Sequence, residues 1–334
     1  MQHEKTRIEW ADIAKGISIL LVVLWHSTFR ANGNMELINS LNEAFIFLRM
    51  PLFFFVSGFF IENSINKSWD SILKTKISNL IYLFLIWAII NDIVFDTAPL
   101  LIKHGTFNLT NPLIYFIKPP GTLWFLYALA IGLIIMKLVR NLPIPLVLPA
   151  FLFLYWFATI DGQWRNVDFF IRVARLIPFM YLGSISFKII NQEIKSYYVY
   201  LWPIIFFTPF MFHIVMNTNL SAMPFVTFLT SILGLVVLLS TSFILSGSWV
   251  GVILCKIGRN SLYIYVLHRI PVALSKKVLF SINDSFNINL IIGYFLVFLI
   301  GLIVPLIVKI FLIKGPLIYL FSQPLAKKHT FKQI

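Results

Sequence analysis

Long apolar runs, separated by short breaks that are charged or rich in proline, glycine and asparagine, make up most of the chain. About 20 apolar residues in a helix cross the core of a bilayer. Runs of about this length predict ten membrane-spanning helices, and the pattern therefore predicts an all-α fold, a polytopic transmembrane bundle. The predicted spans lie near residues 12–30, 43–61, 77–97, 122–140, 144–160, 170–190, 197–216, 223–247, 260–280 and 286–312.

The distribution of basic residues orients this bundle. An even number of spans places both termini on the same side of the membrane, and most of the 27 lysines and arginines fall in segments on that side. Cytoplasmic loops carry an excess of lysine and arginine, so both termini are expected in the cytoplasm. None of the connecting segments is long enough to fold separately, and residues 1–334 are expected to form one integral-membrane domain.

The composition agrees with a membrane protein and argues against a water-soluble globule. Of 334 residues, 59% are hydrophobic and 12% are charged, whereas a soluble domain carries roughly 25% charged residues. The net charge of +14 follows the predicted topology, so the expected partner is the lipid bilayer and no nucleic acid. The charged start MQHEKTRIEWADIAKG lacks the apolar core of a removable signal peptide.

Cysteine and histidine usage narrows the chemistry. The single cysteine, Cys255, excludes an internal disulfide and a cysteine-based metal site. The six histidines show no metal-ligand spacing, and we expect no bound metal.

The first predicted span, AKGISILLVVLWHSTFR, carries an ionisable side chain near each end. Lys15 and His26 are eleven residues apart, a spacing that returns to nearly the same face of an α-helix after roughly 16 Å. Asp12 lies one turn before Lys15, where it can pair with it. A histidine within the membrane is costly and marks a functional site by default. The alternative is a snorkelling lysine and a histidine hydrogen-bonded within the bundle.

The second span and the start of the third add further candidates. LRMPLFFFVSGFF places Arg49 just inside the outer end, followed by the small pair Ser57 and Gly58, where helices can approach closely. The other interpretation is an interfacial arginine and a packing glycine. KSWDSILKTKISNLIYLF places Lys74 and Lys76 at the cytoplasmic face, either as topology anchors or as ligands for an anionic phosphate.

Two later motifs complete a candidate polar chamber. In KPPGTLWFLYAL two prolines and a glycine interrupt the helix, and irregular backbone at membrane depth is tolerated only inside protein or beside a water-filled cavity. Trp124 and Phe125, which follow, belong to an aromatic belt or offer a stacking platform for a sugar ring. GRNSLYIYVLHRI places the adjacent ionisable residues His268 and Arg269 inside the ninth span.

In their order along the chain, these motifs resemble the acyltransferase-3 family of integral-membrane acyltransferases, in particular its short stand-alone branch of sugar O-acetyltransferases. The matching pieces are WADIAKGISILLVVLWH, MPLFFFVSGFF, LWFLYAL and GRNSLYIYVLH. The family pattern of a basic residue, ten residues and a histidine is matched by Lys15 and His26, although a lysine lacks the bidentate fork of the arginine that many members have. A family pair of arginines is matched only approximately by Lys74 and Lys76, and Asn79 stands where another basic residue is expected.

The resemblance implies transfer of an acyl group, expected to be acetyl, from cytoplasmic acyl-CoA to a hydroxyl of a cell-envelope glycan or lipid-linked sugar. Acetyl-CoA is then a co-substrate, and the chain is a multi-pass protein of a bacterial cytoplasmic (inner) membrane. The basic residues expected to bind the phosphates of acyl-CoA are Lys15, Lys74, Lys76 and Arg259.

His26 is the expected catalytic residue, either as a general base or as a transient acyl carrier between the two sides of the membrane. A sugar hydroxyl must lose its proton as it attacks a thioester, and histidine is suited to accept that proton. His268 and Arg269 are expected to orient the base or to stabilise the tetrahedral oxyanion. The residues expected in the acceptor chamber are Arg49, Trp124 and Ser57.

Two other classes of protein fit parts of the pattern. A transporter or glycan flippase also combines about ten helices, intramembrane ionisable residues and broken helices, but no inverted repeat is visible. A structural membrane subunit leaves the intramembrane histidines and arginines unexplained. Release of CoA distinguishes an acyltransferase from a transporter. The motifs leave open the acceptor, the acyl chain length, the side on which the acceptor is modified and the oligomeric state.

Overall fold

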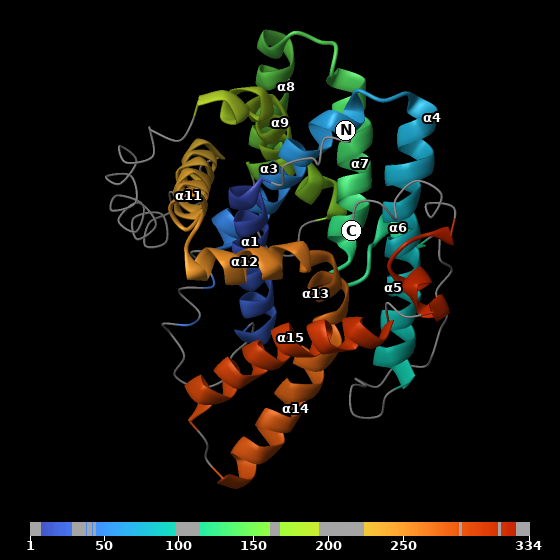
Figure 1. Cartoon of the computed structure of the whole chain (residues 1–334), viewed down its shortest axis with the longest axis vertical. Helices are drawn as coiled ribbons and strands as arrows, with labels where there is room; N and C mark the ends of the chain where they lie inside the picture. Colours follow the sequence, from blue (N-terminus) through green and yellow to red (C-terminus); the bar gives the residue numbers. More distant parts are fainter. Residues whose placement is uncertain are drawn as a thin grey trace.

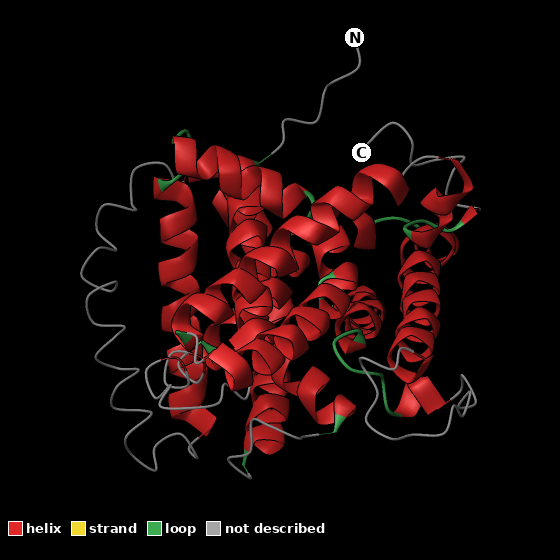
Figure 2. Ribbon diagram, turned by 90° about the horizontal axis from the view of Figure 1, so that it is seen from below, coloured by secondary structure: helices red, strands yellow, loops and turns green. Residues whose placement is uncertain are grey.

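All regular structure in the described part of the chain is helical (Figure 2). The structure is a computed structural model, and it describes residues 8–28, 38, 42, 45–97, 114–160, 168–193, 224–286, 289–312 and 315–324. The helices are α1 (Glu9–Thr28), α3 (Ile46–Ile65), α4 (Trp69–Ile72), the π-helix η1 (Leu73–Ile77), α5 (Ser78–Thr97), α6 (Ile114–Ile117), α7 (Trp124–Val139), α8 (Ile144–Thr159), α9 (Phe169–Glu193), α11 (Pro224–Ile244), α12 (Trp249–Arg259), α13 (Ser261–Leu267), α14 (Arg269–Phe286), α15 (Leu290–Leu312) and the 3₁₀ helix η4 (Gly315–Leu320).

The predicted spans agree with the observed helices over most of the chain. The seventh span, residues 197–216, lies outside the described residues, and each of the others overlaps a helix. Among the described residues, five helical stretches are long and apolar enough to cross a membrane, or six if the bent pair α12 and α13 forms one span. The apolar helices α7 and α8 are shorter, with 16 residues each. The chain is thus an all-helical, multi-pass membrane protein, while the count of ten spans and the cytoplasmic termini remain predictions.

Helix α12 departs from the predicted pattern, which places its residues in a cytoplasmic segment ahead of the ninth span. Ser248 caps its start, because the Ser248 hydroxyl accepts a hydrogen bond from the backbone N–H of Gly251 at 3.0 Å. The helix ends at Asn260, where the chain bends by 58° into α13. Its 11 residues are too few to cross a bilayer as a helix on their own, so the length of apolar runs does not reveal it.

Helix α12 lies across α1 in backbone contact (Figure 1). A Cβ atom at Gly16 would lie 2.3 Å from the carbonyl oxygen of Leu254, and one at Gly258 would lie 1.9 Å from the carbonyl oxygen of Asp12. Small residues at a crossing let two backbones approach this closely. The two glycines therefore seat α12 on the N-terminal half of α1.

Helices α3 and α9 form a second close crossing. A Cβ atom at Gly58 would lie 1.9 Å from the carbonyl oxygen of Met180, and one at Gly183 would lie 1.9 Å from that of Phe55. The close approach predicted at Gly58 is confirmed. Because the contact is reciprocal, neither helix can carry a larger residue there without moving its partner.

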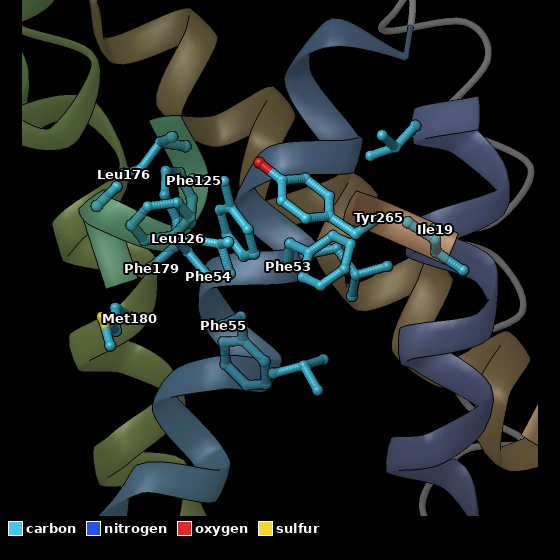
Figure 3. Packing of buried hydrophobic residues seen from close by; sticks show 14 of the residues in the cluster. Ile19, Phe53, Phe54, Phe55, Phe125, Leu126, Leu176, Phe179, Met180 and Tyr265 are labelled. Carbon is cyan, nitrogen blue, oxygen red and sulfur yellow. The ribbon is translucent and has the colours of Figure 1, made fainter. Parts of the chain in front are cut away.

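An aromatic core joins α3, α7 and α13 (Figure 3). The Phe125 ring packs edge-on against Phe53 and Phe54, with ring centroids 4.7 Å and 5.4 Å apart. On its other side the Phe125 centroid lies 5.5 Å from that of Tyr265. All four residues are buried, and such pairs add stability beyond the area they bury. This core fixes three of the four sequence motifs relative to one another.

Candidate functional site

A small cavity lies where the four sequence motifs meet. Its volume is about 30 Å³, which is room for about one water molecule. Helices α1, α3, α7 and α13 and the turn before α7 contribute to its wall. The lining residues are Val22, His26, Met50, Phe53, Thr122, Trp124, Phe125 and Tyr265. Two of the residues predicted from sequence, His26 and Trp124, therefore border the same space.

A second histidine lies next to His26. The ring centroids of His26 and His268 are 5.1 Å apart, and the ring planes are tilted by 45°. His26 is half-buried on α1, whereas His268, at the junction of α13 and α14, is fully buried. Packing of α1 against α13 and α14 brings these two sequence-distant residues together.

The surroundings of His268 define its tautomer. Its Nδ1 atom lies 3.0 Å from the carbonyl oxygen of Ile264 and 2.8 Å from that of Tyr265. Carbonyl oxygens only accept hydrogen bonds, so Nδ1 carries a proton, and in the neutral form of the ring Nε2 bears the lone pair. Within the described ranges this buried Nε2 atom has no hydrogen-bond partner. A buried acceptor without a partner is costly, and this one can accept a proton from His26 or from a bound molecule.

The turn before α7 borders the cavity and requires a glycine. Gly121 has a φ of +51°, and a Cβ atom there would lie 2.3 Å from Nη1 of Arg269. Glycine adopts such a φ without steric cost. The Tyr265 hydroxyl donates a hydrogen bond to the carbonyl oxygen of Thr122 and so ties the turn to α13. The break in the helix predicted at KPPGT is confirmed.

Arginines pack on aromatic rings around the cavity. The guanidinium carbon of Arg49 lies 4.1 Å from the ring centroid of Trp25, and that of Arg172 lies 4.8 Å from the ring centroid of Trp124. Such cation–π contacts hold a guanidinium in place. Arg49 is buried and close enough to His26 to interact with it electrostatically. The structure thus places Arg49 near the histidine pair and adds Arg172, which the sequence did not single out.

Arg269 lies behind the turn, between it and α5. Its guanidinium carbon is 4.2 Å from the ring centroid of Phe95. Its charge interacts with the carboxylate of Asp92, which also accepts a hydrogen bond from the Tyr115 hydroxyl. Arg269 also acts electrostatically on His26. Arg269 is therefore placed to pack against the turn at Gly121 and to contribute positive charge to the surroundings of His26.

Asp12 connects two of the predicted donor-binding residues. Its carboxylate lies 3.6 Å from the Lys15 ammonium and 3.2 Å from Nε of Arg259. The predicted pair of Asp12 and Lys15 is confirmed. The Lys15 ammonium also lies 3.5 Å from the ring centroid of Phe60. Arg259 reaches this group because α12 crosses α1.

Lys74 and Lys76 belong to a different element, the π-helix η1 at the start of α5. Both side chains are exposed, and Lys74 pairs with Asp70 at 2.7 Å. Helix η1 packs against α4, α5 and α7. The predicted phosphate ligands therefore form two groups on separate elements rather than one cluster.

Sequence reasoning missed several residues that line the cavity. Phe53 and Tyr265 fall inside the motifs, but the pattern alone indicates apolar packing. Tyr265 carries a usable signal, since it precedes His268 by three residues and so shares its helix face. Ser57, predicted for the chamber, does not line the cavity. The part of the chain that the structure describes has no group of three or more histidine, cysteine, aspartate or glutamate residues suited to a metal ion.

Comparison with known proteins assigns a family to this arrangement. The chain is 23% identical over 299 residues to the inner membrane protein YcfT of Escherichia coli strain K12, and the match covers 79% of each chain. No solved structure matches it. A family model described as an acyltransferase domain matches residues 8–313, a range that includes the cavity residues, His26 and His268. The chain therefore belongs to the acyltransferase-3 family of membrane proteins.

Proposed function

We propose that this protein is a membrane O-acyltransferase that moves an acyl group from cytoplasmic acyl-CoA to a hydroxyl of a cell-envelope glycan or lipid-linked sugar. The proposed acyl group is acetyl. The observation that carries the proposal is the pair of His26 and His268, with His26 in the wall of the cavity, in a chain of the acyltransferase-3 family. Similarity to an inner membrane protein supports a place in a bacterial cytoplasmic membrane.

His26 supplies the base in a direct transfer. It accepts the proton of the sugar hydroxyl while the sugar oxygen forms a bond to the acyl carbonyl carbon. The tetrahedral intermediate then collapses, the carbon–sulfur bond breaks, and CoA leaves as a thiolate that takes up a proton. His268 assists, because its Nε2 lone pair can accept a hydrogen bond from an N–H of the His26 imidazolium. This bond would orient the His26 ring.

A two-step transfer uses the same residue in a different order. A ring nitrogen of His26 attacks the thioester, CoA leaves, and the resulting acyl-imidazole is attacked by the sugar hydroxyl. Only this route releases a stoichiometric amount of CoA before any acceptor binds. The order of events is therefore measurable.

The basic residues support a donor site at the N-terminal half of α1. Lys15 and Arg259 lie there, and ammonium and guanidinium groups bind phosphate through charge-assisted hydrogen bonds. Lys15 is roughly 16 Å from His26 along the helix, a distance that the extended pantetheine arm of acyl-CoA can cover. Since the cavity holds about one water molecule, the helices around it must separate to admit a thioester and a sugar.

Thiol release from acetyl-CoA tests the proposal. The detergent-purified chain is incubated with acetyl-CoA, with and without a glycan extract of bacterial membranes, and free CoA is measured. His26→Ala is expected to lose CoA release while keeping its thermal midpoint, and Lys15→Ala is expected to weaken acetyl-CoA binding. His104→Ala, at a histidine outside the described residues, is the matched control.

The outcomes separate the alternatives. Undiminished release by His26→Ala would refute the catalytic role of that residue. A folded wild-type chain that neither binds acetyl-CoA nor releases CoA would favour the transporter. A burst of one CoA per protein without extract identifies the acyl carrier, and release only with extract identifies the general base.

A further inference from the structure

Residues 315–324, which we call the C-terminal clasp, are fastened to the side of α5 (Figure 1). The Tyr82 hydroxyl donates a hydrogen bond to the carbonyl oxygen of Tyr319 at 2.9 Å, and Trp87 Nε1 donates one to that of Leu320 at 2.7 Å. These carbonyls end the 3₁₀ helix η4, where helix geometry leaves acceptors without partners. Phe321, which follows, is buried against Trp87, with ring centroids 5.6 Å apart.

Within the C-terminal clasp, Gln323 contacts the π-helix η1, which carries Lys74 and Lys76. Gln323 is 6% exposed, and its amide nitrogen donates to the carbonyl oxygen of Lys74 at 2.8 Å and to the Ser78 hydroxyl at 2.7 Å. Its backbone N–H donates to the side-chain oxygen of Asn79 at 3.0 Å. Asn79, at a position where another basic residue was expected, thus serves as an anchor for the clasp.

The π turn changes the hydrogen bonding of the Lys74 carbonyl. In an α-helix it would accept the backbone N–H of Ser78, but here that N–H bonds to the carbonyl of Leu73, one residue earlier. The Lys74 carbonyl accepts instead the Ser78 hydroxyl at 2.7 Å and the Gln323 amide at 2.8 Å. Gln323 therefore bonds a carbonyl that the π turn releases from the Ser78 N–H, and this bond favours the π form over the α form.

The π turn also determines where the two lysines point. A π turn contains one residue more than an α turn, and each residue of an α-helix rotates the chain by about 100°. Relaxation of the turn to α geometry would rotate the residues within it relative to α5, by up to about that angle at its N-terminal end. The directions of Lys74 and Lys76 relative to the bundle thus depend on the clasp.

We propose that Gln323 is a positioning residue for the acyl donor: it holds the π turn at Leu73–Ile77 and thereby aims Lys74 and Lys76 at the phosphates of acyl-CoA. This inference rests on the proposed function for its ligand. The claim that the C-terminal clasp restrains the π turn depends only on the hydrogen bonds of Gln323, and not on the identity of the ligand.

Binding of acetyl-CoA to the full-length chain in detergent tests the proposal. Gln323→Ala is expected to raise the dissociation constant about three- to tenfold, as loss of a buried hydrogen bond that supports a binding group does. Ser322→Ala, at the neighbouring half-buried residue, is the matched control and should bind as the wild type does. In a chain that already carries Lys74→Ala and Lys76→Ala, Gln323→Ala should add little, because the residues it positions are gone.

Hydrogen exchange provides a readout that needs no ligand. Backbone amides of residues 73–79 should exchange faster in Gln323→Ala than in wild type or Ser322→Ala, since the turn is less restrained. Unchanged exchange there, or unchanged acetyl-CoA binding by Gln323→Ala, overturns the proposal, as does an undiminished effect in the chain that lacks both lysines. A wild-type chain that binds no acetyl-CoA overturns the proposed function and the donor role together, and the exchange comparison then still decides whether the clasp holds the turn.

Discussion

The crossing of α3 and α9 provides a sharp test of the packing. In Gly58→Ala the new Cβ atom would lie 1.9 Å from the carbonyl oxygen of Met180, whereas ordinary contact begins at 3.4 Å. The helices must therefore separate by about 1.5 Å at this point, the difference between those two distances. Both contacting atoms belong to rigid helix backbone, so the cost falls at the upper end of overpacking penalties, about 3 kcal/mol.

The net effect on stability follows from two opposing terms. Alanine gains about 1 kcal/mol over glycine in a helix, which leaves a loss of about 2 kcal/mol for Gly58→Ala. The thermal midpoint, followed in detergent by tryptophan fluorescence, should fall by about 4–8 °C. Transfer activity should fall as well, because α3 carries Met50 and Phe53 in the cavity wall.

Gly132→Ala is the matched control, because its Cβ atom meets the same neighbour at a softer point. That atom would lie 2.4 Å from the sulfur of Met180, at the flexible end of the side chain. Met180 can adopt another rotamer at little cost, so this variant should keep the wild-type midpoint within about 2 °C. Equal midpoints for the two variants, or a Gly58→Ala chain as stable as wild type, would refute the crossing geometry.

Three further changes test the site and its supports. Gly121→Ala should lower transfer activity and cost about 1–2 kcal/mol of stability, because a φ of +51° and the nearby Arg269 leave no room for a Cβ atom; a thermal midpoint and activity equal to wild type would contradict this. Asp12→Asn should cost about 1 kcal/mol by leaving Lys15 without its carboxylate, and an unchanged midpoint in thermal unfolding would count against the ion-pair cluster. Phe53→Ala should widen the cavity, so the ratio of turnover with butyryl-CoA to turnover with acetyl-CoA should rise; an unchanged ratio would remove Phe53 from the acyl site.

Local patterns predicted the elements of this protein well. The length of the apolar runs identified helices at each predicted span within the described residues, because crossing a bilayer imposes a minimum helix length that is legible in sequence. The prolines and glycine of KPPGT predicted a break for an equally local reason, since they restrict backbone dihedrals. The spacing of Asp12 and Lys15 predicted their pairing, because residues one turn apart share a helix face.

The candidate site was predictable only in part. The sequence singled out His26 and His268 as polar residues in apolar surroundings, but their separation along the chain said nothing of their 5.1 Å contact. The cavity wall includes Phe53 and Phe125, whose apolar side chains look the same in sequence whether they border a cavity or pack in a core. Which of the two they do depends on the neighbouring helices.

Hydropathy, chain breaks and short motifs identify this chain as a helical membrane protein with acyltransferase-3 motifs, because they are properties of neighbouring residues. The crossing of α12 over α1, which brings Arg259 to Asp12, and the hydrogen bond from Gln323 to the Lys74 carbonyl are visible only in the folded structure. Each of these contacts joins residues more than 200 positions apart. Their energies arise from packing and hydrogen-bond geometry between whole helices, which no local pattern encodes.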